Sequence, residues 1–139
     1  RAARRSIDTA RDRLRQGAAL LVFAEGTRSR TGRMQRMLPG AARYIEEPGT
    51  WVVPMGIAGT EALFPIDSER LRPSDVVVRV GRPFEAGTLI RKAGRNRRLA
   101  MDGIGLALAA LVPRAYRGTY GGDGDGLGSA RELLASLHD

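Results

Sequence analysis

The sequence predicts an α/β fold, with a mixed, largely parallel sheet flanked by helices. A short apolar run at residues 20–23 stops at an acid and a glycine, as buried strands do where they meet a loop. Two further segments, residues 51–60 and 75–81, are rich in β-branched residues and read as strands. Apolar residues at helical spacing precede the first strand and follow the last.

Composition limits the kind of protein. The 139 residues suffice for one domain with a real core, and no apolar run approaches the roughly 20 residues that cross a bilayer. We therefore expect neither a transmembrane helix nor a signal peptide. The absence of cysteine rules out disulfides, thiolate metal sites and a cysteine nucleophile, and it fits a reducing cytoplasm.

The net charge of +8 indicates an anionic partner. Charge alone does not distinguish phospholipid headgroups, nucleic acid and a phosphate-rich acyl donor. Aromatic residues are only 5% of the chain and do not alternate with the basic runs, as they would on a single-strand platform. We therefore expect no nucleic acid. A basic domain that binds nucleic acid or anionic membranes without catalysis is the alternative function.

The first predicted helix starts near Ser6, a capping residue, and ends at Gly17. Its apolar stripe consists of Ile7, Ala10 and Leu14. Residues 18–24 then predict a strand that is buried on both faces, joined to the helix by a very short connection.

A polar loop follows that strand. Glu25 and Arg28 leave the strand end as a carboxylate and a planar cation three residues apart. Ligands of open α/β sheets bind at this end of the strands, and a guanidinium suits a bidentate grip on phosphate. Residues 33–40 predict a second loop folded over this site. Its methionines either line the rim or belong to the core.

The rest of the chain predicts alternating elements. Residues 41–47 read as a short helix, 51–60 as a strand interrupted at Pro54, and 75–81 as an edge strand. Residues 62–65 form either an apolar surface lip or a buried loop. The longest helical pattern runs over residues 90–112, with five cations near its start that oppose the helix dipole unless a loop or an anion accommodates them.

Composition also divides the chain. Residues 1–120 are expected to form the globular part, 121–128 a glycine-rich linker, and 129–139 a short C-terminal helix. Alternating glycine and aspartate in the linker suggest calcium only faintly, because Leu134 falls where an EF-hand loop from Asp123 needs an acid. No metal site is expected.

Two stretches resemble a known family. Residues 23–29, Phe-Ala-Glu-Gly-Thr-Arg-Ser, resemble the third block of the glycerolipid acyltransferases, Phe-Pro-Glu-Gly-Thr-Arg-Ser, with Ala24 in place of proline. Residues 52–57 resemble the fourth block, Val-x-Pro-Val-x-Ile, with Met55 for valine. Relatives often carry a lysine at the position of Pro39, and Arg36 is a possible replacement for that cation.

The resemblance implies a glycerol-phosphate acyltransferase-like fold and an enzyme of phospholipid synthesis. Such an enzyme moves a fatty acyl group from a thioester donor, acyl-CoA or acyl carrier protein, to a hydroxyl of a lysophospholipid or glycerol phosphate, without a cofactor. In the family a His-x-x-x-x-Asp pair supplies the general base. This chain lacks that pair, and its one histidine is His138. We therefore expect no catalytic residue here, a resemblance that covers the C-terminal half of the domain, and no activity without the N-terminal half.

The resemblance also implies site residues. Arg28 is expected to grip the phosphate of the acceptor, Glu25 to fix the loop, and Gly26 and Thr27 to supply backbone shape and a hydroxyl, with Ser29 completing the set. On the acyl side, the residues implied are Val53, Pro54 and Met55, although a central strand that only packs explains them equally well. The expected location is the inner face of the cell membrane, where the enzyme would be peripheral on an anionic surface.

Overall fold

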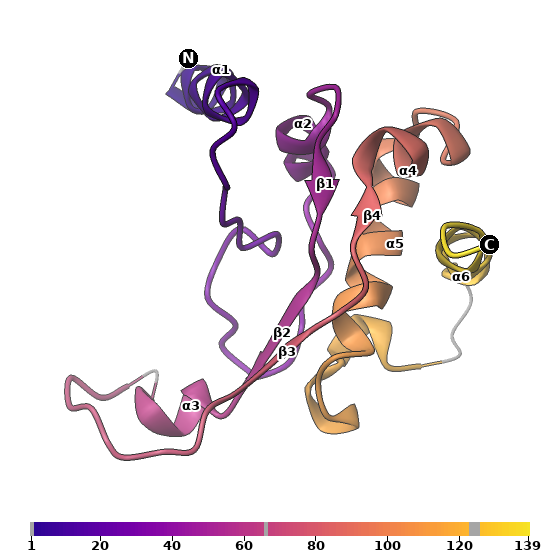
Figure 1. Cartoon of the computed structure of the whole chain (residues 1–139). Coiled ribbons are helices and arrows are strands. Elements are labelled where there is room, and N and C mark those ends of the chain that lie inside the picture. Colours follow the sequence, from indigo (N-terminus) through magenta and orange to yellow (C-terminus); the bar gives the residue numbers. More distant parts are fainter. Residues whose placement is uncertain (1, 66, 123–125) are drawn as a thin grey trace.

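A computed structural model describes residues 2–65, 67–122 and 126–139. Helices and short strands are mixed along the chain, which agrees with the α/β class (Figure 1). Both strand pairings in the described residues are antiparallel two-stranded ladders, and the largely parallel sheet that the sequence suggested is not formed among them.

Helix α1 (Ala2–Arg15) opens the described chain. It starts before Ser6, so the expected cap is wrong: alanine and arginine are strong helix formers, and they extend the helix in the N-terminal direction. Gly17, with φ of +82°, ends it as predicted. The apolar stripe is confirmed, since Ala10 is buried and Ile7 and Leu14 are half-buried.

Two arginines of α1 are not simply solvated. Arg11 and Arg15 donate to the two carboxylate oxygens of Glu47 at 3.0 and 2.7 Å. Hydrogen bonds from Arg15 lower the pKa of Glu47, although its burial acts in the opposite direction. This ion pair attaches α1 to the segment after α2 (Ala42–Ile45).

Residues 18–23 are extended but do not form the predicted buried strand. Leu21 and Phe23 are 75% and 72% exposed, and no described strand pairs with this segment. A strand is stabilised by ladder bonds and by packing on its faces, and this segment has neither. Just after it, the Leu38 amide donates to the Ala24 carbonyl at 3.1 Å, which ties the chain to a more distant segment.

The strands form two ladders. A short 3₁₀ turn (Pro39–Ala41) leads into α2, which ends before Pro48 as predicted. The ladders pair β1 (Trp51–Val52) with β4 (Phe84–Glu85) and β2 (Met55–Ala58) with β3 (Val77–Val80). The predicted interruption at Pro54 is confirmed, and so is the edge strand within residues 75–81: β3 pairs only with β2 among the described strands, and all four of its residues are exposed.

The β2–β3 ribbon extends past one end of α5 (Arg97–Ala109) toward α3 (Thr60–Leu63), as Figure 1 shows. After α3, Phe64 is 38% exposed. The segment at residues 62–65 is therefore a surface lip rather than a buried loop.

The single long helix predicted over residues 90–112 is wrong. The structure has two helices, α4 (Ala86–Lys92) and α5 (Arg97–Ala109), separated by a turn in which Gly94 and Arg95 have positive φ. Asn96 caps α5, because its side chain accepts from the Leu99 amide at 3.1 Å. The apolar stripe that indicated the helix, Met101, Ile104, Leu108 and Leu111, lies entirely after this break and therefore gave no information about the residues before it.

The five cations predicted near the start of the long helix are Arg91, Lys92, Arg95, Arg97 and Arg98. Arg91 and Lys92 lie in the last turn of α4, where the helix dipole stabilises positive charge. Most of these cations have partners. Arg97 donates to Glu46 at 2.7 Å, and the remaining partners are Glu85 for Arg91, the Ser136 carbonyl for Lys92 and Asp102 for Arg98.

The core lies among α4, α5 and α6 (Gly128–Ser136), with β4 at one side (Figure 1). Its buried residues include Leu89, Met101 and Leu133, and Met37 enters it from the loop before α2. The helix expected near residues 129–137 is confirmed as α6. The proposed linker falls partly on residues 123–125, which lie outside the described residues, and the division into 1–120, 121–128 and 129–139 stays a prediction.

Candidate phosphate-binding loop

The signature loop, residues 24–33, starts with a tight turn at Gly26. Its φ is +74°, and its amide donates to the Phe23 carbonyl at 3.0 Å. A Cβ at this position would clash with the Leu38 side chain. The left-handed backbone favours glycine here, and a larger residue would also require the exposed Leu38 side chain to move.

Glu25 points back toward the returning chain. Its Oε2 accepts from the Gln35 amide at 2.8 Å, and the residue is half-buried. This contact braces the start of the loop against residues 35–38. It agrees with a loop-fixing role, whereas orientation of a substrate by Glu25 stays a prediction.

Arg28 is exposed and rests on the lip after α3. Its Nη2 donates to the Phe64 carbonyl, and its guanidinium carbon lies 5.0 Å from the centre of the Phe64 ring. Stacking on an aromatic face restricts a guanidinium without using up its N–H donors. The remaining donors of Arg28 are available to an anion at the surface.

The other predicted loop residues differ in role. Thr27 is exposed. Ser29 is an internal brace: its Oγ donates to the Arg33 carbonyl at 2.7 Å and accepts from the Thr31 amide at 3.3 Å. Its hydroxyl is therefore engaged within the loop.

The acyl-side candidates lie apart from this loop, at the junction of β1 and β2. Val53 and Met55 are 49% and 43% exposed, whereas Pro54 is buried and its carbonyl accepts from the Gly81 amide at 2.8 Å. Trp51 and Ile57 are exposed as well, so every second residue from 51 to 57 is exposed. Two of the three candidates are thus available at an apolar surface, and their role in acyl binding stays a prediction.

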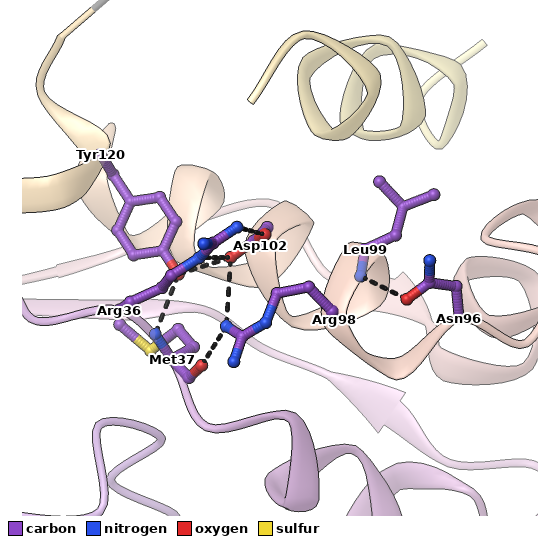
Figure 2. Close-up of polar contacts among 7 residues, drawn as sticks. All are labelled: Arg36, Met37, Asn96, Arg98, Leu99, Asp102 and Tyr120. Carbon is purple, nitrogen blue, oxygen red and sulfur yellow. Dashed lines mark hydrogen bonds and ion pairs between the residues drawn. The ribbon is translucent and has the colours of Figure 1, made fainter. Parts of the chain in front are cut away.

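Beneath the signature loop is a buried polar cluster that the sequence reasoning missed, and Figure 2 shows it. Asp102 of α5 is 3% exposed, and Arg36 donates to its two oxygens at 3.1 and 2.6 Å. Tyr120 also donates to Asp102, at 3.1 Å, and Arg98 lies 3.5 Å away. The detectable signal was a single acid inside an otherwise apolar stretch of helix.

Charges in this cluster shift the pKa values of its members. Burial disfavours the ionised carboxylate of Asp102, but the hydrogen bonds from Arg36 and Tyr120 and the nearby cations outweigh it, so the pKa of Asp102 is lowered. The same pairing raises the pKa of Arg36. Burial raises the pKa of Tyr120 to about 12. At neutral pH the cluster therefore contains an ionised Asp102 and a neutral Tyr120.

Arg36 thus has its own counter-ion. The sequence left open whether it replaces a family lysine in holding phosphate; in the structure its guanidinium is occupied by Asp102. Arg33 differs, because it lies with Arg114 at a shallow hollow that Ala115, Gly118 and Gly121 complete. None of the described residues that line this hollow carries a carboxylate.

A backbone contact links this hollow to the loop. The Met34 amide donates to the Tyr116 carbonyl at 2.8 Å, and the Thr119 amide donates to the Met34 carbonyl at 3.3 Å. Gly118 is pressed against Met34 so closely that a Cβ would clash with its carbonyl. The C-terminal part of the chain therefore supports both sides of the returning segment.

The arrangement defines an exposed cationic loop at the surface of an α/β protein, and the segment that returns from this loop is bound to a buried acid through Arg36. The family model described as Acyltransferase matches residues 1–58, which include the signature loop, β1 and β2. No solved structure shows a significant match to the chain.

Curated proteins give the same assignment. A 1-acyl-sn-glycerol-3-phosphate acyltransferase of Chlamydomonas reinhardtii is 41% identical over 69 residues, which is 49% of this chain and 21% of that protein. A 1-acyl-sn-glycerol-3-phosphate acyltransferase of Cocos nucifera is 33% identical over 56% of this chain and 25% of that protein. The chloroplastic enzyme BAT2 of Brassica napus, which has the same name, is 37% identical over 51% of this chain and 21% of that protein.

Together these matches support the glycerolipid acyltransferase family for this chain. The chain spans about a fifth to a quarter of the length of these relatives. Among the residues that the structure describes, every helix is too short or too polar to cross a bilayer.

Proposed function

We propose that this chain holds the phosphorylated acceptor in an acyltransferase of phospholipid synthesis. The reaction would transfer a fatty acyl group from a thioester of coenzyme A or acyl carrier protein to a hydroxyl of glycerol phosphate or a lysophospholipid. The relatives named as 1-acyl-sn-glycerol-3-phosphate acyltransferases support this proposal. The observation that carries it is Arg28, an exposed guanidinium fixed on Phe64 at the rim of a braced loop.

Catalysis would need a general base from outside this sequence. The chain contains no His-x-x-x-x-Asp pair. The complete enzyme would supply it from the other half of the domain, next to the signature loop. In that complete domain, further strands would pair with residues 18–23 and build the larger parallel sheet. We expect the 139-residue chain alone to show no acyl transfer, and measurable turnover would contradict this assignment of roles.

The proposed location is a peripheral one on an anionic membrane surface, at the inner face of the cell membrane. The net charge of +8 supports it. Because most cations at the α4–α5 turn have protein partners, attraction to lipid would depend on other arginines, including Arg28, Arg30 and Arg33. Binding to anionic vesicles but not to duplex DNA at equal ionic strength is the expected result. The reverse preference would favour the nucleic-acid alternative.

Binding of sn-glycerol 3-phosphate tests the proposal directly. In a titration followed by ¹H–¹⁵N NMR, we expect amides of residues 26–31 to shift with sn-glycerol 3-phosphate and not with glycerol. Arg28→Ala should weaken this binding at least about tenfold, as loss of a charge-assisted contact does. Arg79→Ala on β3 is the matched control, because it removes one exposed arginine elsewhere. Equal loss in both variants would show that only net charge matters.

A further inference from the structure

We propose that Asp102 is a positioning residue for the signature loop and thereby sets the affinity of the acceptor site without touching the acceptor. The inference rests on the proposed function. It starts from the position of Asp102, a carboxylate that is 3% exposed on α5, between Met101 and Gly103 in the core. Burial of a charge is costly unless every lone pair is used, so its partners show what it stabilises.

Those partners come from distant parts of the chain. Arg36 binds both oxygens of Asp102 and belongs to the segment that returns from the signature loop. Tyr120 donates to Asp102 and also accepts from the Met37 amide at 2.9 Å. Arg98 lies beside Asp102 and donates to the Met37 carbonyl at 2.6 Å (Figure 2). Both backbone groups of Met37 are thus bound by side chains that Asp102 orients.

The anchored segment in turn holds the signature loop. On one side of Arg36, the Gln35 amide donates to Glu25. On the other side of Met37, the Leu38 amide donates to the Ala24 carbonyl. These two bonds fix Ala24 and Glu25, the two residues immediately before Gly26. Hydrogen bonds and the short backbone segment at residues 35–38 therefore connect the buried carboxylate to the base of the phosphate-binding loop.

This path has a consequence for binding. A loop that is already ordered loses less conformational entropy when a ligand binds, so a loosened anchor should lower affinity although Arg28 is unchanged. Electrostatics alone predicts the opposite. Removing the charge of Asp102 would free the cation of Arg36 and raise the positive potential near the loop, which favours an anion. The sign of the effect therefore separates positioning from charge.

The test uses the 139-residue chain with sn-glycerol 3-phosphate as the probe. For Asp102→Asn we expect the Kd to rise about tenfold, with faster hydrogen exchange at the amides of Gln35 and Met37. Tyr120→Phe should produce a smaller change in the same direction. Glu46→Gln is the matched control. It removes a carboxylate that pairs with Arg97 of α5, the helix that carries Asp102, and not with any described residue of the signature loop. It should leave both measurements nearly unchanged.

Unchanged or tighter binding in Asp102→Asn would overturn the inference, and so would an equal loss in Glu46→Gln. Should Asp102→Asn fail to fold, Tyr120→Phe gives the same readout, since it removes one partner of Asp102 and of the Met37 amide without changing any charge at neutral pH. Loss of binding in Arg28→Ala together with normal binding in these variants would refute the positioning role of Asp102 and leave the proposed function standing. Absence of binding in the unmodified chain would instead refute the proposed function and, with it, the inference.

Discussion

Leu21 and Leu89 carry the same side chain in opposite surroundings: Leu21 is 75% exposed and Leu89 is fully buried. The contrast extends to their regions. Residues 18–23 and the β2–β3 ribbon expose large apolar side chains, whereas α4, α5 and α6 bury theirs in one core. The family match covers residues 1–58, which include residues 18–23 and β2 but no part of α4, α5 or α6. The helices that form most of the core thus lie outside the family match.

The two regions meet at Met37 and Arg36. Met37 is 1% exposed in the helical core, and Arg36 pairs with Asp102 of α5. The segment between the signature loop and α2 is therefore stabilised by residues more than sixty positions later in the chain. A loop that carries the family motif takes its order from a part of the sequence outside the family match.

The largest expected effect compares the two leucines directly. Leu89→Ala should lower the free energy of unfolding by about 3 kcal/mol, because it removes buried apolar area and leaves a cavity. Leu21→Ala should change it by less than about 0.5 kcal/mol, as surface substitutions do. Urea unfolding followed by circular dichroism measures both. A comparable loss in Leu21→Ala would mean that residues 18–23 are packed in solution, which would remove the contrast between the regions.

A second comparison lies within the signature loop. Gly26 and Gly32 both have positive φ, of +74° and +72°, but only at Gly26 would a Cβ meet a neighbour, Leu38. Gly32→Ala should cost about 1 kcal/mol for the left-handed backbone alone. Gly26→Ala should cost up to about 1 kcal/mol more, because the exposed Leu38 side chain must move away from the new Cβ. Urea unfolding of the two variants would give equal losses if the loop were not packed against Leu38.

Local patterns predicted much of the fold. Pro54 interrupts its strand and Gly17 ends α1, because each of these outcomes depends on a residue's own backbone. The turn between α4 and α5 had equally local signals, Gly94 and the cap Asn96. The apolar stripe that indicated one long helix lies only after that turn, so it did not show whether the helix continues through the residues before it.

The errors concern contacts over long distances. Residues 18–23 have the composition of a buried strand, yet a strand depends on neighbours, which their own sequence does not specify. For the candidate site, the motif located Glu25, Gly26 and Arg28 in one loop. It did not reveal Asp102 or Tyr120, because Asp102 lies 66 residues from Arg36 and only the fold brings the two together.

The last prediction concerns Tyr120, whose hydroxyl contacts both Met37 and Asp102. Its effect on the free energy of unfolding appears at alkaline pH rather than at neutral pH. Burial raises its pKa from 10.0 to about 12, so the folded state keeps the phenol protonated when the unfolded state has lost its proton. The stability that this gives is complete below pH 10 and is lost as the pH rises to about 12. In Tyr120→Phe that loss should be absent, so the free energies of unfolding of the two proteins should converge between these pH values.

Unfolding by urea at a series of pH values measures this convergence, and absorbance at 295 nm follows ionisation of the phenols. The control is Tyr116→Phe. A hydrogen bond with Glu61 raises the pKa of Tyr116 as well, but that contact is exposed, so its variant should keep most of the alkaline loss. If Tyr116→Phe abolished the loss and Tyr120→Phe preserved it, Tyr120 would not be buried against Asp102. The helical region would then not support the segment that returns from the signature loop.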